Sequence, residues 1–133
     1  MDEDEARRRF GVSGVARLAT VTPQGSPHLV PVTFAVSGDT LYSAVDGKPK
    51  GSTRLQRLAN VGHEPRVSLL VDHYEDDWDR LWWVRADGTA RVHETTATGL
   101  EALSAKYEQY RAQPPPGPFI EVNLTGWRWW SAN

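Results

Sequence analysis

The sequence predicts a mainly β protein of six or seven antiparallel strands, with two or three helices inserted between hairpins. Short runs rich in β-branched residues alternate with turn residues, and helical patterns occur only between these runs. Antiparallel sheets of this size must hide their edges, which favours a small closed or split β-barrel. The 133 residues, 39 % hydrophobic and 24 % charged, fit a single domain spanning residues 1–133.

The first half of the chain reads as a short helix followed by an antiparallel meander. A charged amphipathic helix is expected over residues 2–10, stopped by Gly11 and Gly14. A second helix is expected from the N-cap pair Ser52-Thr53 to about Val61. The strands of this half are expected over residues 15–22, 27–36 and 40–45.

The second half adds further strands and one helix. A helix beginning near Thr95-Thr96 carries an apolar stripe and ends before Pro114. Strands are expected over residues 66–72, 81–94, 119–124 and 127–131, the first of them buried on both faces. Asp87-Gly88 fits either a hairpin turn or a glycine bulge within one long strand.

Composition argues against several classes of function. The absence of cysteine excludes disulfides and thiolate chemistry, and no apolar run reaches the roughly 18 residues of a membrane-crossing helix. The acidic N-terminus lacks the pattern of a signal peptide, so a cytoplasmic protein is expected. The net charge of -2 argues against nucleic acid as a partner, and the spacing of the four histidines predicts no metal site.

One segment has the residue types of an anion site. Gly51 lets the backbone approach a ligand closely, and the first turn of the following helix presents free amides. The cations and hydroxyls that surround this position are those of Lys48, Lys50, Ser52, Thr53 and Arg54. Together they suit a phosphate, although a solvated loop before a capped helix explains the same residues.

Taken in order, several segments resemble the flavin and deazaflavin split-barrel family that includes the pyridoxamine 5'-phosphate oxidases. The segments that carry the resemblance are residues 16–21, 25–32, the Lys-rich loop before the helix, residues 65–71, and residues 82–85 leading to Gly88. Asp72-His73-Tyr74 and the run from Asp77 to Trp83 resemble the actinobacterial branch that uses the deazaflavin coenzyme F-420. The family carries the glycine at Gly88 inside one continuous strand, which favours the bulge.

The resemblance implies an FMN-binding type of split barrel that forms a homodimer, with a cofactor site in each cleft between the subunits. It assigns the phosphate to Lys48, Lys50, Ser52, Thr53 and Arg54, and the isoalloxazine ring to the backbone of Pro31, Val32 and Thr33. No catalytic acid or base is evident, so no catalytic residue is named. The cofactor supplies the hydride chemistry in such enzymes.

The leading hypothesis is a coenzyme F-420-dependent oxidoreductase that transfers a hydride to or from a small organic molecule. Lys50, Arg54 and Arg57 fall on one side of the early helix, and this charge favours the multiply anionic coenzyme over singly phosphorylated FMN. An FMN-binding flavoprotein is the alternative. A further alternative is a small-barrel binder of single-stranded nucleic acid, with tryptophan rings stacking on bases and Arg17, Arg85, Arg91 and Arg128 following the backbone.

Overall fold

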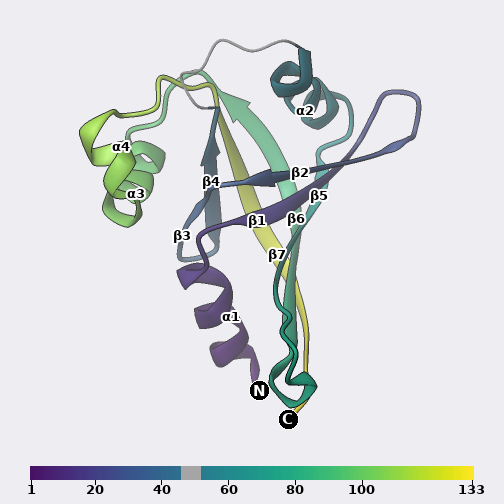
Figure 1. Cartoon of the computed structure of the whole chain (residues 1–133). Helices are drawn as coiled ribbons and strands as arrows, with labels where there is room; N and C mark the ends of the chain where they lie inside the picture. The colour runs from purple at the N-terminus through teal and green to yellow at the C-terminus, as the bar shows by residue number, and fades with distance from the viewer. Residues whose placement is uncertain (46–51) are drawn as a thin grey trace.

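A computed structural model describes the backbone of residues 1–45 and 52–133 and the side chains of residues 1–45 and 56–133 (Figure 1). The helical segments are α1 (Glu3–Val12), α2 (Ser52–His63), α3 (Ala97–Lys106), α4 (Glu108–Ala112) and a 3-10 turn, η1 (Trp78–Arg80). The strands are β1 (Ala16–Val21), β2 (Pro27–Val32), β3 (Ala35–Ser37), β4 (Thr40–Ala44), β5 (Arg66–His73), β6 (Trp82–His93) and β7 (Phe119–Ser131).

These strands form a seven-stranded sheet in the order β2-β1-β5-β6-β7-β4-β3, and every paired neighbour is antiparallel. Figure 1 shows β1 and β2 crossing in front of β4 and β7, so the sheet curls back on itself. Its two edge strands, β2 and β3, are consecutive in the sequence and separated only by Thr33 and Phe34. The predicted mainly β split barrel is therefore confirmed, and the split lies at Thr33–Phe34.

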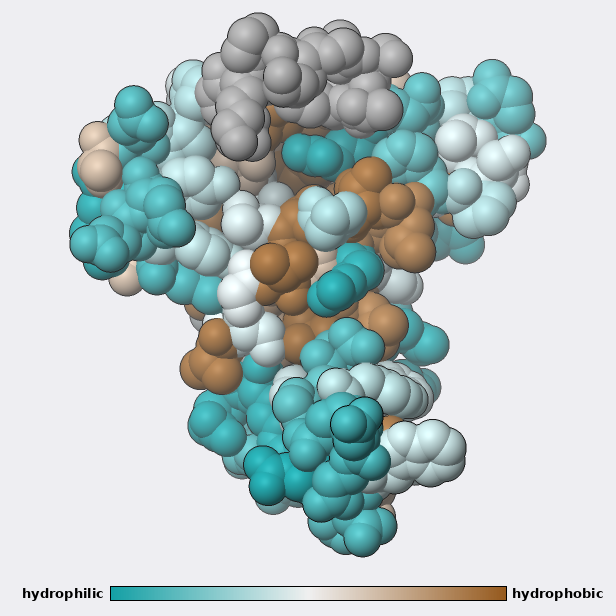
Figure 2. Space-filling model, in the orientation of Figure 1, coloured by the Kyte–Doolittle hydropathy of each residue, from teal (hydrophilic) through white to brown (hydrophobic). Residues whose placement is uncertain are grey.

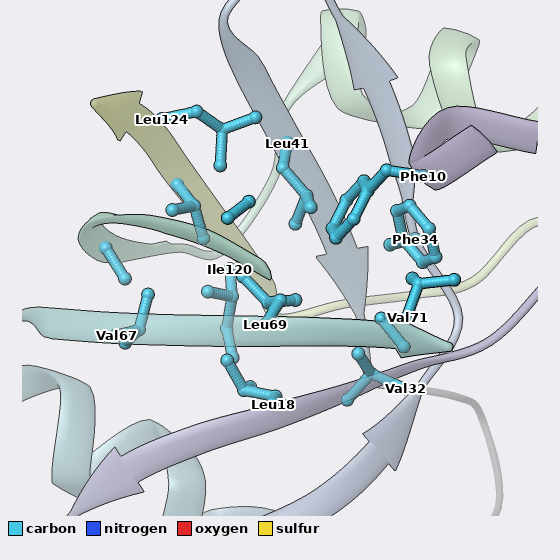
Figure 3. Close-up of a cluster of buried hydrophobic side chains, with 14 of the residues drawn as sticks. Phe10, Leu18, Val32, Phe34, Leu41, Val67, Leu69, Val71, Ile120 and Leu124 are labelled. Atoms are coloured by element: carbon cyan, nitrogen blue, oxygen red, sulfur yellow. The ribbon is translucent and has the colours of Figure 1, made fainter. Parts of the chain in front are cut away.

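The core fills the space that the curled sheet encloses. Figure 3 shows labelled side chains from β1, β5 and β7, among them Leu18, Leu69 and Ile120, converging on this space. Helix α1 contributes Phe10, whose ring centroid lies 5.1 Å from that of Phe34 and 5.2 Å from that of Trp127. All of these side chains are buried, so α1 packs against the core through Phe10.

Helix α1 was predicted over residues 2–10 and runs from Glu3 to Val12, with Asp2 as its N-cap. The Asp2 side chain accepts a hydrogen bond from the Glu5 backbone amide at 2.9 Å. The predicted stop at Gly11 is wrong, because the helix continues to Val12 and the chain becomes extended at Ser13. A glycine in the last turn weakens a helix without ending it when its φ stays negative.

Two strand predictions merged or divided elements wrongly. The predicted strand over residues 27–36 is two strands, because Thr33 and Phe34 leave the ladder at the split. The predicted pair over residues 119–124 and 127–131 is the single strand β7, which runs through Thr125-Gly126. Strand β6 is also continuous, so the hairpin alternative is wrong. Its register with β7 shifts at Asp87/Gly88, but the extra residue of this bulge is Thr125 of β7 and not Gly88.

At Gly88, opposite the bulge, β7 leaves no room for a side chain. A Cβ atom added there would lie 2.2 Å from the carbonyl oxygen of Asn123 on β7. No side chain fits at that distance, so β6 and β7 approach as closely as they do only because position 88 lacks a Cβ.

Two further predictions are corrected. The helix expected after Thr95-Thr96 is interrupted at Tyr107, which has an extended backbone between α3 and α4. Strand β5 is not buried on both faces: Val67, Leu69 and Val71 are buried, whereas Leu70 is 37 % exposed. Position 70 lies on the outer side of the pleat, where the described residues leave it partly exposed.

Candidate functional site

A cavity of about 220 Å³ lies beside the split in the barrel. Its lining comes from the last residues of β2 and β4, from the residue before β1 and the residue after β2, and from α2 and α4. We call it the β2 cavity; its lining residues are Val15, Pro31, Val32, Thr33, Ala44, Arg57 and Tyr110. The three residues predicted to face an isoalloxazine ring, Pro31, Val32 and Thr33, are thus brought together in one wall.

Thr33 is held by hydrogen bonds from two separate elements. Its hydroxyl lies 2.8 Å from the hydroxyl of Tyr110 on α4. Its carbonyl oxygen accepts a hydrogen bond from Ser43 on β4 at 2.7 Å. These bonds fix the position of Thr33 where the ladder of β2 has already ended, so this wall of the cavity has a defined shape.

Helix α2 places one cation at the cavity. Asn60, which is fully buried, donates to the Thr20 hydroxyl on β1 at 3.0 Å and accepts from Gln56 at 2.7 Å. This polar contact seats α2 against the sheet, and Arg57, on the same helix, lines the cavity. Arg57 is five residues beyond the first helical residue, or about 7.5 Å along the helix axis.

The predicted phosphate residues are only partly described. Ser52, Thr53 and Arg54 form the first turn of α2 by their backbone, as the N-cap pattern suggested. Lys48 and Lys50 lie outside the described residues. The phosphate assignment therefore stays a prediction.

The outer face of the barrel is unusually apolar where β1, β2 and β5 meet. Figure 2 shows hydrophobic side chains gathered over these strands in the middle of the face. Leu29 is 66 % exposed and Leu70 37 % exposed. The pairing aligns one outward row across five strands: Pro31, Arg17, Leu70, Arg85 and Arg128.

The arginines of this face are matched by carboxylates. Arg17 lies 3.9 Å from Asp72, and Arg85 contacts Asp87 at 3.0 Å. Farther along β6, Arg91 contacts Glu121 at 3.3 Å. Three of the four arginines proposed for a nucleic-acid backbone thus already face negative charge, which weakens that alternative.

Two perturbed groups lie next to the cavity, at the end of α3. Burial lowers the pKa of Lys106 to about 8. Burial also raises the pKa of Tyr107, against the opposing effect of its hydrogen bond to the Phe34 backbone. Neither residue is among those that line the cavity.

A second hollow, of about 500 Å³, lies between α1 and the β5–β6 end of the sheet. It is larger than the β2 cavity and includes Arg8, Arg9 and Arg80. Glu5 holds Arg8 and Arg9, and Glu75 lies 3.3 Å from Arg80, so the cations there are already neutralised by neighbours. We prefer the smaller β2 cavity as the candidate site because Pro31, Val32 and Thr33, which the resemblance assigns to the ring, line it.

Other kinds of site receive no support from the part of the chain that the structure describes. No group of three or more His, Cys, Asp or Glu side chains there is placed to hold a metal ion. No helix in that part is long and apolar enough to span a bilayer.

Comparison with known proteins decides the family. The family model described as pyridoxamine 5'-phosphate oxidase matches residues 2–131. This chain belongs to the pyridoxamine 5'-phosphate oxidase family. The resemblance to this family that was read from the sequence is thereby confirmed.

A curated protein with a similar sequence is the 5a,11a-dehydrotetracycline/5a,11a-dehydrooxytetracycline reductase of Streptomyces rimosus. The two proteins are 37 % identical over 59 residues, which is 44 % of this chain. The matched part spans 40 % of the relative's length. The similarity therefore concerns less than half of either protein.

Solved structures share the fold of this family member. A conserved hypothetical protein of Mycobacterium tuberculosis has a TM-score of 0.74 and 24 % identity, over 100 % of this chain and 86 % of that one. An FAD binding protein of Mycobacterium smegmatis has a TM-score of 0.67 and 17 % identity, over 98 % and 95 %. The heme storage protein of Vibrio cholerae has a TM-score of 0.68 and 15 % identity, over 95 % and 92 %. What this chain shares with these solved structures is the fold.

Sequence reasoning missed four residues of the site and its support. Val15, Ala44 and Tyr110 line the cavity but were assigned to strands and to a helix stripe. Lys106 was not singled out. Its one signal was its position three residues after the buried Leu103, on the apolar side of the helix, where a lysine is unusual.

Proposed function

We propose that this family member binds coenzyme F-420 with its ring in the β2 cavity and transfers a hydride between the coenzyme and a small organic molecule. The observation that carries the proposal is the lining of the cavity. Pro31, Val32 and Thr33 form one wall, and Arg57 from α2 lies at the same cavity. A wall for the ring and a cation for the anionic part of the coenzyme thus meet in one place.

The residues present fit a flavin-type ring. The wall is a strand end whose cavity-facing residues are largely apolar, which suits a flat aromatic system. The hydroxyls of Thr33 and Tyr110 supply polar groups at the same cavity for the ring's nitrogen and oxygen atoms. At about 220 Å³ the cavity holds part of such a molecule and leaves the rest to be covered by something else.

Charge supports the deazaflavin coenzyme over FMN. The coenzyme continues past its phosphate into a polyglutamate tail, so it carries several negative charges where FMN has a single phosphate. Lys48, Lys50 and Arg54 precede Arg57 in the sequence, and a cluster of this kind attracts a multiply charged anion most strongly. FMN remains the alternative cofactor, since the same phosphate residues would serve it.

The similarity to the Streptomyces reductase supports a reductive reaction. That protein is named for the reduction of a dehydrotetracycline, and it shares 37 % identity with this chain over 59 residues. We propose an unsaturated, electron-poor small molecule as the substrate of this chain.

The protein's own part in the reaction is placement and exclusion of water. When bound, a reduced deazaflavin supplies the hydride. The wall of Pro31 and Val32 keeps water from one side of the cavity. The hydrogen bond between Thr33 and Tyr110 holds two polar groups in fixed positions at the same cavity. One of these two hydroxyls donates its hydrogen to the other. The hydrogen of the accepting hydroxyl can be donated to a polar atom of a ligand in the cavity.

We also propose that the chain folds as one domain and works as a homodimer. The outer face formed by β1, β2 and β5 exposes Leu29 and Leu70, and Pro31 of the cavity wall lies in the same outward row. Arg17 and Arg85 alternate there with Asp72 and Asp87, so the face is complementary to a second copy of itself. A second copy on this face would cover the open side of the cavity.

The test is a titration of the purified protein with coenzyme F-420, FMN and haemin at low and high ionic strength. We expect the tightest binding for coenzyme F-420, with a preference over FMN that shrinks as salt screens the basic cluster. Lys50→Ala should weaken binding by roughly 1.5–3 kcal/mol, the value of a charged hydrogen bond, without unfolding the protein. Arg66→Ala is the matched control, since Arg66 is exposed and pairs with Glu64.

The proposal fails if FMN and coenzyme F-420 bind equally, or if FMN is preferred at every salt concentration. Tight binding of haemin alone would assign the cavity to a different cofactor. Unchanged affinity in folded Lys50→Ala and Lys48→Ala variants would place the phosphate elsewhere.

A further inference from the structure

The break in strand pairing at Thr33 and Phe34 lies next to a wall of the candidate site. β2 and β3 are the two edges of the sheet, and no strand ladder joins one to the other across Thr33 and Phe34. Thr33 lines the β2 cavity, and it follows Pro31 and Val32 directly. Whatever fixes Thr33 and Phe34 therefore fixes that wall.

Lys106, the last residue of α3, bonds to both chain segments that meet here. Its Nζ donates to the carbonyl oxygen of Phe34 at 2.8 Å and to that of Ser13 at 2.6 Å. The same nitrogen lies 3.7 Å from the centroid of the Phe34 ring. Lys106 thus ties the segment between α1 and β1 to the link between β2 and β3.

Tyr107 makes a parallel set of contacts one residue later. Its hydroxyl accepts a hydrogen bond from the Phe34 backbone amide at 3.0 Å. The same hydroxyl lies within donating distance of two carbonyl oxygens, that of Phe34 at 2.9 Å and that of Gly14 at 2.8 Å. The break between α3 and α4 at Tyr107 directs this side chain to the link, so the two residues act on the same two segments.

Stability alone does not explain a lysine in this place. No carboxylate among the described residues lies within ion-pair distance of Lys106. A partly buried ammonium whose partners are neutral carbonyls loses much of its hydration, and burial accordingly lowers its pKa to about 8. An apolar side chain of similar length would avoid that cost.

We infer that Lys106 and Tyr107 are positioning residues for the β2 cavity, which they shape by holding Thr33–Phe34 against Ser13–Gly14. Val15, one residue beyond Gly14, lines the same cavity. We call Lys106 and Tyr107 the clasp. The clasp fixes the positions of two lining segments relative to each other, so the affinity for a ligand that contacts both segments depends on it. The inference rests on the proposed function for its ligand and on the geometry alone for its effect on the chain.

The experiment compares Lys106→Met and Tyr107→Phe with the wild-type protein in two measurements. The first is the Kd for coenzyme F-420 and for FMN. The second is amide hydrogen exchange of residues 13–15 and 31–35. We expect Lys106→Met to raise the Kd about tenfold and to speed exchange in both segments, while its free energy of unfolding stays equal to the wild type or rises.

Two further variants make the result specific. Lys106→Arg keeps donors for the two carbonyl oxygens and should restore most of the affinity. Arg111→Ala is the matched control, because Arg111 is an exposed cation on the neighbouring helix that bonds the carbonyl oxygens of Ser104 and Ala105. It should change neither measurement.

Each outcome decides the inference. An unchanged Kd and unchanged exchange in Lys106→Met would overturn it. A general loss of stability, with faster exchange throughout the sheet, would make Lys106 a structural residue only. If the wild-type protein binds neither F-420 nor FMN, the proposed function fails, and exchange in residues 31–35 still decides whether the clasp holds the link.

Discussion

The hydroxyl groups of Thr33 and Tyr110 lie 2.8 Å apart and join the end of β2 to α4. Residues 77 positions apart in the sequence thus form one edge of the β2 cavity. The contact couples a helix at the side of the barrel to the strand proposed to carry the coenzyme ring. It is also a polar feature of a cavity wall that is otherwise largely apolar.

Tyr110→Phe should lower coenzyme affinity about fivefold, which corresponds to about 1 kcal/mol, because the Thr33 hydroxyl loses its partner. The free energy of unfolding should fall by a similar amount. Tyr74→Phe is the control, since Tyr74 is 63 % exposed. Wild-type affinity in a folded Tyr110→Phe protein would remove this pair from the binding site.

Leu70→Arg should convert a dimer into a monomer, because it removes an exposed apolar side chain and adds a third positive charge between Arg17 and Arg85 on the outer face. Light scattering should give twice the chain's mass for the wild type and the mass of one chain for the variant. Val92→Arg, at an apolar position that is 39 % exposed on β6, should leave the dimer intact. A monomeric wild-type protein at micromolar concentration would contradict the proposed interface.

Gly88→Ala should lower the free energy of unfolding by roughly 1–3 kcal/mol or more, because the new methyl group would lie 2.2 Å from the Asn123 carbonyl oxygen. Gly62→Ala is the matched control, since Gly62 lies in α2 with open space around it. That variant should gain about 0.5–1 kcal/mol. Chemical denaturation of both proteins measures the difference, and equal stabilities would mean that the strands can separate at the bulge.

Stability should rise with pH above about 8. The folded protein releases the Lys106 proton near pH 8, whereas the unfolded chain holds it up to the ordinary value of 10.5. Between these values the unfolded state binds more protons, so deprotonation favours the folded state. Denaturation midpoints at pH 7 to about pH 9.5, below the range of the tyrosines, should increase in the wild type and stay level in Lys106→Met. A fall in the wild type over this range would contradict the lowered pKa.

Much of the fold was predictable because the strands follow from local residue preference. β-branched runs located β1, β4 and β5 to within one or two residues. Thr125-Gly126 predicted a turn that β7 does not make, because its pairing with β6 across the bulge overrides the local preference of these residues. The break at Thr33–Phe34 was missed for the opposite reason: neither residue is a turn former, and the burial of Phe34 decides it.

The site was predictable only where one strand carries it. Pro31, Val32 and Thr33 are consecutive, so a single motif located the wall that they form. Tyr110 and Lys106 come next to that wall through contacts that span more than 70 residues of chain, and no local pattern encodes such contacts. The lysine was visible only as a charge on an otherwise apolar helix face.

The most direct test of the central claim is a crystal structure of the protein with coenzyme F-420 bound. The account predicts the ring against Pro31, Val32 and Thr33, with Tyr110 beside it and the phosphate toward the start of α2. A ring bound elsewhere, such as in the hollow between α1 and the β5–β6 end of the sheet, would contradict it.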